Sequence, residues 1–404
     1  MKTAYFPFMN SSIAGFVQFF RKPLFSDFRF IFSIYAAATL FASIKAVFLF
    51  GSNNYSIFYY SLYHLIDGKS LYEVYPAEYS DHFHYAPTFA ALFSPVFSLP
   101  YSVGLFIWQF LFTAVWVVAV YRMPWTHGQK VVAYWFGLQE LFTSVVGSQT
   151  NPLIAAISLF TFLSFERRQP FWAAFFIILG FNIKIYSLVA AALFLLYPQK
   201  LRFLAYMVFW GVVLALLPLL FTSPEKLWWQ YEMWVRQLFI KSDGDKWANT
   251  SIHRLVHLII SPNVATPAII GTGVVLFCTV YAHTRRFSER TFRMLMLASI
   301  LIFQVIFNPV AESPTYITAV TGVLCWWFFC PQSWLDRVLL ISCFILTVLS
   351  PSDVFPIFLR EQFVKPYVLK ALPCVLIWFR ILYLMHVPSR VPQVTPKPQA
   401  TLLS

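Results

Sequence analysis

Residues 103–121 read VGLFIWQFLFTAVWVVAVY, a continuous run without a charged side chain. About 20 apolar residues in a row are enough for one helix to cross the hydrocarbon core of a bilayer. Comparable runs recur along the whole chain, several of them shorter than this one. They predict twelve membrane spans, over residues 30–50, 103–121, 129–147, 152–165, 171–182, 185–197, 203–221, 266–283, 292–308, 313–330, 336–349 and 369–386.

The composition excludes a water-soluble protein. Hydrophobic residues make up 59% of the 404 residues and charged residues only 11%, against roughly 45–50% and 25% in soluble globular proteins. A soluble enzyme, a disordered chain and a fibrous protein are therefore excluded. We expect an all-α polytopic membrane protein, a bundle of about 10 to 13 transmembrane helices with structured external loops.

The net charge of +13 does not indicate nucleic acid as a partner, because the basic residues are scattered in short connections between apolar runs. There they act as topology signals, and their distribution places both termini in the cytoplasm. Residues 1–29 lack an apolar stretch typical of a cleavable signal peptide. The predicted organisation is a cytoplasmic segment (1–29), a transmembrane domain (30–386) with long external loops (51–102, 222–265 and 350–368), and a Pro-rich cytoplasmic tail (387–404).

The five cysteines show no spacing typical of a metal site, and we interpret them as small buried hydrophobic residues. No cofactor is expected, and the need for a metal ion stays open. The cysteines are Cys278, Cys325, Cys330, Cys343 and Cys374.

The first external loop concentrates polar chemistry in an apolar chain. Residues 64–84 contain four acids and three histidines among many tyrosines. Carboxylates, imidazoles and aromatic rings are the groups that a sugar-binding site needs. The alternative is an interfacial belt of aromatic anchors, which explains the tyrosines but not the acids and histidines. We interpret the loop as part of a functional site.

Two further polar segments interrupt apolar runs. Gln149 and Asn151 lie in the turn 147–152, which also fits a plain helix end and restart. Asn182 and Lys184 lie within the stretch 180–186. Lys184 either extends its amine to the lipid headgroups or faces a cavity, where it would be a natural partner for a phosphate.

The last two polar segments lie in the second half of the chain. Four aromatic residues at 228–234 predict an amphipathic helix on the outer leaflet, and Asn249, Ser251 and Arg254 follow it. Glu312 is costly near the membrane unless it is paired, with Lys184 or Arg254, or lines a wet cavity. Glu140 lies within a predicted span and has no motif around it.

These segments, in this order, resemble glycosyltransferase family 87 over residues 45–330. The motifs that carry the resemblance are Asn54-Tyr55, Gly68 to Tyr72, Tyr85-Ala86-Pro87, Leu99-Pro100, Ser148 to Asn151, Lys184, Asn249 to Ser251, and Asn308-Pro309 with Glu312. The resemblance implies the GT-C architecture and transfer of a hexose, often mannose, from a polyprenyl-phosphate sugar donor. The acceptor would be a glycan or glycolipid.

The family has an aspartate as its proposed catalytic base where this chain has Asn54. Asparagine cannot accept a proton at a useful pKa, so Asp81, Glu73, Asp67 or Glu312 would take that role, with Asp81 preferred and Glu312 next. The resemblance further implies that Lys184 and Arg254 hold the donor phosphate. The implied substrate-binding residues are Tyr72, Tyr85, Gln149, Asn151, Asn182, Asn249 and Ser251.

Two other functions fit the same sequence. A transporter or flippase of lipid-linked glycans would use the charged residues within the membrane as a path, and an inactive scaffold would explain Asn54. The resemblance favours the enzyme, in the plasma (inner) membrane, with its active site facing the periplasm or the cell exterior. The enzyme requires Lys184, Glu312 and the first loop around one cavity.

Overall fold

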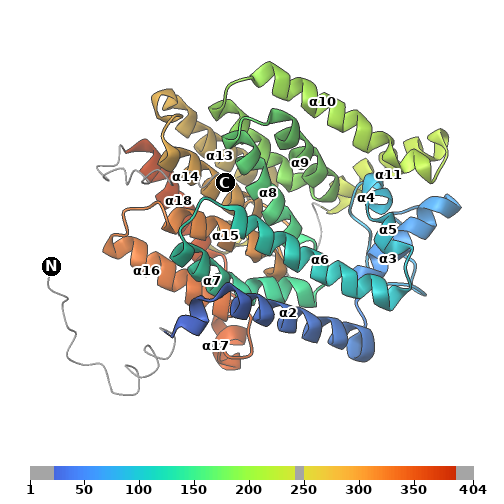
Figure 1. Cartoon of the computed structure of the whole chain (residues 1–404), viewed down its shortest axis with the longest axis horizontal. Coiled ribbons are helices and arrows are strands. Elements are labelled where there is room, and N and C mark those ends of the chain that lie inside the picture. Colours follow the sequence, from blue (N-terminus) through green and yellow to red (C-terminus); the bar gives the residue numbers. More distant parts are fainter. Residues whose placement is uncertain (1–21, 242–249, 388–404) are drawn as a thin grey trace, which may run out of the picture.

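The computed structural model describes residues 22–241 and 250–387, and all regular structure in these ranges is helical (Figure 1). The predicted all-α class is therefore confirmed for this part of the chain. Within these described ranges, three segments are long and apolar enough to cross a membrane: Phe28–Phe50, Tyr101–Arg122 and Lys200–Leu220. The protein is a membrane protein.

Each of the three spans begins as a regular α-helix. The first is α2 (Phe28–Lys45), which continues as a π-helix over Ala46–Phe50. The second is α6 (Tyr101–Arg122), and the third is α10 (Lys200–Leu216) with a 3₁₀ turn over Leu217–Leu220. Only 17% of the most apolar window of the third span is buried within the protein. Its side chains therefore face outward, where lipid covers them.

The remaining predicted spans are also helical, but they are shorter, so the number that cross the membrane stays a prediction. Residues 185–197 are an exception in type, because Ile185–Leu196 form a 3₁₀-helix rather than an α-helix. The α-helices are α7 (His127–Val146), α8 (Asn151–Glu166), α9 (Pro170–Ile183), α13 (Thr266–Cys278), α14 (Arg290–Ile306), α15 (Tyr316–Trp327), α16 (Trp334–Ser342) and α18 (Leu372–His386).

The centre of the bundle consists of α8, α14 and α15 (Figure 1). Every residue of α15 from Tyr316 to Trp326 is buried. Polar side chains in this core find partners across helices: the Trp116 indole nitrogen donates to the Thr321 hydroxyl oxygen at 3.0 Å. A helix that is apolar all round, like α15, is stable only when other helices enclose it, which places it at the centre.

The first external loop folds into helices of its own. These are α3 (Asn53–Asp67), α4 (Pro87–Leu92) and α5 (Ser94–Phe97), which gather with α11 (Pro224–Lys241) at one end of the bundle (Figure 1). Gln230 of α11 joins the two loops, because its side-chain nitrogen donates to the Lys69 carbonyl at 2.6 Å and its oxygen accepts from the Leu71 amide at 3.1 Å.

The tryptophans of α11 do not all point outward. Trp228 is 70% exposed, as an anchor at the membrane surface would be, but Trp234 is buried. The hydroxyl of Tyr231 donates to the Ala215 carbonyl at 2.9 Å. The helix is therefore packed into the protein on one side, where the sequence predicted only a helix lying on the outer leaflet.

Four of the five cysteines are buried, as predicted, and Cys278 is exposed. The prediction is wrong for Cys278, since a residue in an apolar span either packs inside the bundle or faces outward. The sequence pattern of α13 does not distinguish the two sides. Of the predicted terminal segments 1–29 and 387–404, residues 1–21 and 388–404 lie outside the described residues.

Candidate functional site

The turn between α7 and α8 is tied to α6 by two hydrogen bonds of Ser148. Ser148 adopts a left-handed backbone conformation with φ of 50°, which is uncommon for a residue other than glycine. Its hydroxyl accepts from the Gln109 side-chain nitrogen at 2.9 Å, and its carbonyl accepts from the Trp108 indole nitrogen at 3.0 Å. Both partners belong to α6. These contacts fix the backbone of the turn immediately before Gln149 and Asn151.

Asn54 reaches the same turn from α3. Its side-chain nitrogen donates to the Gly147 carbonyl at 2.7 Å. Ser52 caps α3 by accepting from the Tyr55 amide and contacts the Ser148 hydroxyl at 2.8 Å. Asn54 of the first loop is therefore adjacent to the second polar segment.

Lys184 lies at the break between two helices. The α-helix α9 ends at Ile183, Lys184 is extended with φ of −142°, and the 3₁₀-helix begins at the next residue. Its amine donates to the Asn151 side-chain oxygen at 2.6 Å. The side-chain nitrogen of Asn151 is buried and has no hydrogen-bond partner in the described part of the chain. The two residues thus form one polar unit joining the second and third polar segments.

Side chains from all five predicted polar segments line one cavity of about 110 Å³, the segment over 228–254 through Trp234. Its wall contains Asn54, Asp81 and Tyr85 from the first loop, Gln149 from the α7–α8 turn, Lys184 from the helix break, and Asn308 and Glu312 from the connection between α14 and α15. The enzyme interpretation required Lys184, Glu312 and the first loop to surround one cavity. The structure meets this condition.

Two of the four candidate bases line this cavity, and the other two do not. Asp81 and Glu312 line it and are exposed. Asp67 instead pairs with Lys69 at 3.0 Å on the exposed surface, and Glu73 is exposed outside the cavity wall. Only Asp81 and Glu312 are therefore placed beside Lys184.

Tyr85 contributes a neutral hydroxyl to this site. Burial raises the pKa of Tyr85, the nearby Glu312 carboxylate raises it further, and the hydrogen bond with Thr150 opposes them. The Tyr85 and Thr150 hydroxyl oxygens are 3.4 Å apart. Tyr85 therefore stays protonated and can donate a hydrogen bond.

Two histidines in the cavity wall were not among the predicted site residues. The His82 ring nitrogen Nδ1 is 3.0 Å from the Tyr72 carbonyl oxygen, and the His84 Nδ1 is 3.4 Å from the Gln237 side-chain nitrogen of α11. Both line the cavity. In the sequence the two histidines flank Phe83 directly before Tyr85-Ala86-Pro87, and this pattern could have indicated them as site residues. In the described residues no group of three or more His, Cys, Asp or Glu is placed to hold a metal ion.

Several predicted substrate-binding residues lie behind the cavity wall rather than in it. The Tyr72 hydroxyl donates to the Tyr85 carbonyl at 3.0 Å, and the Asn182 side-chain nitrogen donates to the Ile178 carbonyl at 2.8 Å. Ser251 caps α12 (Ile252–Ile259) by accepting from the His253 amide at 3.3 Å. Asn249 lies outside the described residues. Direct binding of substrate by these residues stays a prediction.

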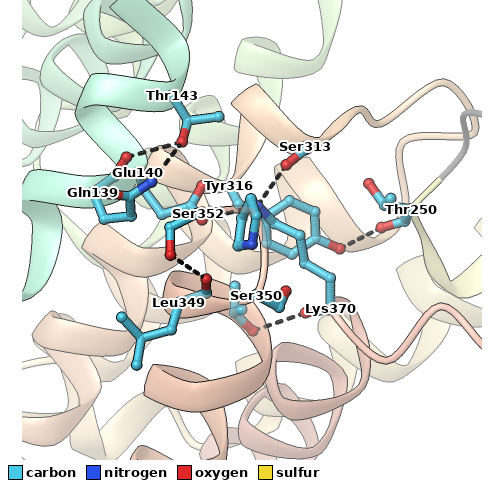
Figure 2. Close-up of polar contacts among 12 residues, drawn as sticks. Gln139, Glu140, Thr143, Thr250, Ser313, Tyr316, Leu349, Ser350, Ser352 and Lys370 are labelled. Atoms are coloured by element: carbon cyan, nitrogen blue, oxygen red, sulfur yellow. Dashed lines mark hydrogen bonds and ion pairs between the residues drawn. The ribbon is translucent and has the colours of Figure 1, made fainter. Parts of the chain in front are cut away.

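Arg254 and Glu140 lie away from this cavity. Arg254, on α12, lines a second cavity, so it does not share the wall that contains Lys184. Glu140 of α7 is fully buried and pairs with Lys370 at 2.8 Å (Figure 2). The Lys370 amine also donates to the Ser313 hydroxyl at 2.7 Å. Glu140 therefore has a structural partner, which the sequence did not indicate.

The sequence profile of glycosyltransferase family 87 matches residues 83–309, more than half of the chain. The chain belongs to glycosyltransferase family 87. Lys184, Gln149 and Arg254 lie within the matched range, whereas Asn54 and Asp81 precede it and Glu312 follows it. No curated protein matches the chain. Membership of family 87 makes the protein a membrane glycosyltransferase by family, with a sugar donor and an acceptor as substrates.

Proposed function

We propose that this member of family 87 transfers a hexose from a polyprenyl-phosphate donor to a hydroxyl of a lipid-linked or cell-envelope glycan. The observation that supports the proposal is one cavity in which Lys184 shares the wall with the carboxylates of Asp81 and Glu312. A phosphate leaving group needs the cation, and an acceptor hydroxyl needs a carboxylate.

The reaction is a displacement at the anomeric carbon. The acceptor oxygen forms its bond to that carbon as the bond to the donor phosphate oxygen breaks, and polyprenyl phosphate departs with the electron pair. The acceptor proton moves to Asp81 or Glu312 acting as general base. Lys184 stabilises the negative charge that grows on the departing phosphate. Tyr85 and Gln149, which line the cavity, would donate hydrogen bonds to sugar hydroxyls.

The identity of the sugar is proposed from the family resemblance, and the membrane and its orientation from the charge distribution. Mannose is the proposed hexose, because family 87 often transfers it. The predominance of lysine and arginine in the short connections supports a plasma-membrane protein whose cavity faces the periplasm or exterior.

The role of Lys184 as the phosphate-binding cation is tested by an assay of transfer from a radiolabelled polyprenyl-phosphate hexose in membranes that contain the full chain. Lys184→Gln should lower the rate by about 100-fold or more, since charge stabilisation of a leaving group is worth that much. Lys184→Arg should retain more activity than Lys184→Gln. The control, Lys200→Gln, removes an exposed lysine outside the cavity and should leave transfer unchanged.

The base is tested in the same assay. Asp81→Asn and Glu312→Gln are compared with Glu73→Gln, which changes an exposed acid outside the cavity wall. Loss of the base should lower the rate by roughly 100-fold to 10,000-fold. Full activity in all of the cavity variants would contradict the assignment of this cavity as the active site. No transfer by the unmodified chain with polyprenyl-phosphate hexoses would instead favour the inactive scaffold.

A further inference from the structure

A second cavity, of about 550 Å³, lies beside the connection between α14 and α15. Its wall combines four basic side chains, Arg254, Arg360, Lys365 and Lys370, with apolar ones such as Val364 and Val368. No carboxylate is among the described residues that line it. A wall of this composition favours a ligand with a negative group and an apolar part.

The basic residues of this wall are not equally available to a ligand. Lys370 is buried and is held between Glu140 and Ser313 (Figure 2). Lys365 is 64% exposed, and its partner Glu361 at 2.8 Å is 42% exposed. Such a pair contributes little, because water screens it. Lys365 can therefore turn toward another anion at small cost.

Arg360 is held in position from behind. Its Nη1 donates to the Ser352 carbonyl at 3.2 Å and is 3.7 Å from the fully exposed Asp353 carboxylate. Its Nε pairs with the Glu361 carboxylate at 3.3 Å, so Glu361 is shared between Arg360 and Lys365. The Arg360 side chain is only 18% exposed. These contacts hold an arginine at the cavity with a guanidinium whose planar fork suits phosphate oxygens.

The segment next to the cavity carries large apolar side chains on its outside. It contains α17 (Ile357–Leu359) and a π-helix over Arg360–Val364. Ile357 is 64% exposed, Phe358 is 67% exposed and Tyr367 is 58% exposed. Exposed apolar side chains beside basic residues are typical of a segment that lies in the interface of a bilayer. The cavity would then open at the depth of the lipid headgroups.

We propose that this second cavity binds the phosphate headgroup of an anionic membrane phospholipid. Arg254, Arg360 and Lys365 contact the phosphate, and an acyl chain lies along Val364 and Val368. The proposal rests on insertion in the membrane and not on sugar transfer. Ser313 lines this cavity and is adjacent to Glu312 of the other one, so a lipid here lies next to the transfer site without sharing Lys184.

The test is native mass spectrometry of the full-length protein in detergent, titrated with dioleoyl phosphatidylglycerol or dioleoyl phosphatidylcholine. One phosphatidylglycerol should stay bound under conditions that remove phosphatidylcholine. The double variant Arg360→Gln, Lys365→Gln should bind it roughly tenfold more weakly or worse, because each basic residue contributes to binding of anionic lipid. Arg254→Gln, on a separate helix, tests the same site if the double variant does not fold.

A matched control removes the same two residue types from an exposed place, Lys200→Gln with Arg202→Gln at the start of α10. It should bind phosphatidylglycerol as the unmodified chain does. Equal binding of the two lipids, or equal loss in the control, would overturn the proposal. So would displacement of the lipid by inorganic phosphate at equal concentration, because the site would then recognise phosphate alone. None of these results depends on whether the chain transfers sugar.

Discussion

Asn54 has a function that an aspartate cannot perform. Its side-chain nitrogen donates to the Gly147 carbonyl at 2.7 Å and joins α3 to the turn before α8. A carboxylate at this position has no proton to donate and would face the carbonyl oxygen. Asn54 therefore makes a structural contact, and under the proposed function the base is Asp81 or Glu312 in the same cavity wall.

Asn54→Asp should lower the stability of the protein by about 1–3 kcal/mol, the cost of leaving a polar group without its partner. The neighbouring Asn53 is the control, since its side-chain oxygen accepts from the Ser80 amide at 2.8 Å. Asn53→Asp keeps that acceptor. Thermal unfolding in detergent at neutral pH compares the two variants, and equal melting temperatures would contradict the role of the Asn54 amide.

Between elements, the contact of α14 with α15 depends on the absence of a side chain at Gly322. A Cβ built there would lie 2.9 Å from the Ala298 carbonyl oxygen and 2.9 Å from the Leu301 Cβ. Neither neighbour is the flexible end of a side chain, so the helices would have to move apart. Gly211, within α10, has no atom within 4 Å of the corresponding position.

Gly322→Ala should destabilise the protein by about 1–3 kcal/mol through overpacking. Gly211→Ala should leave it unchanged or stabilise it by up to about 1 kcal/mol, because alanine favours the helix. The two melting temperatures, measured side by side, should move in opposite directions or differ clearly. A similar fall in both would indicate that helix packing at Gly322 is not the cause.

The ion pair of Glu140 with Lys370 joins α7 to the segment before α18. Both side chains are buried, and their distance is 2.8 Å. Lys370→Met leaves a buried carboxylate unpaired and should cost about 3–5 kcal/mol. The double variant with Glu140→Gln removes that charge and should recover most of the loss. Lys69→Met, in the exposed pair with Asp67, should have little effect on the melting temperature.

For the whole molecule, two histidines outside the predicted spans make stability depend on pH. Burial lowers the pKa of His64 in α3, although the Glu78 carboxylate opposes the shift. Burial also lowers the pKa of His253 in α12, against the opposing hydrogen bond to the Phe307 carbonyl. The folded protein therefore holds both rings neutral to a lower pH than the unfolded chain does.

The unfolded chain binds more protons between the lowered pKa values and the ordinary value of 6.5. Stability is then complete above pH 6.5 and falls as the pH decreases through this window. The melting temperature should drop between pH 7.5 and 5.5, and the drop should be smaller in the variant His64→Gln, His253→Gln. A slope that is the same in both proteins would assign the pH dependence to other groups.

The helical, membrane-embedded character of the chain could be predicted from its sequence, because apolar runs such as 103–121 are a local property. The same holds for the five polar segments, since a charged residue among apolar ones is conspicuous in one dimension. The helix types were less predictable: the 3₁₀-helix over Ile185–Leu196 has the same apolar composition as an α-helical span.

Only the tertiary structure decided which polar residues meet. Lys184 shares a cavity with Asp81 and Glu312, while Arg254 lines a different one with Lys370. Glu140 finds Lys370 across 230 residues of chain. The physical reason is that hydropathy is set by a residue and its neighbours in sequence, whereas these meetings depend on which helices pack together and on how each is rotated about its axis.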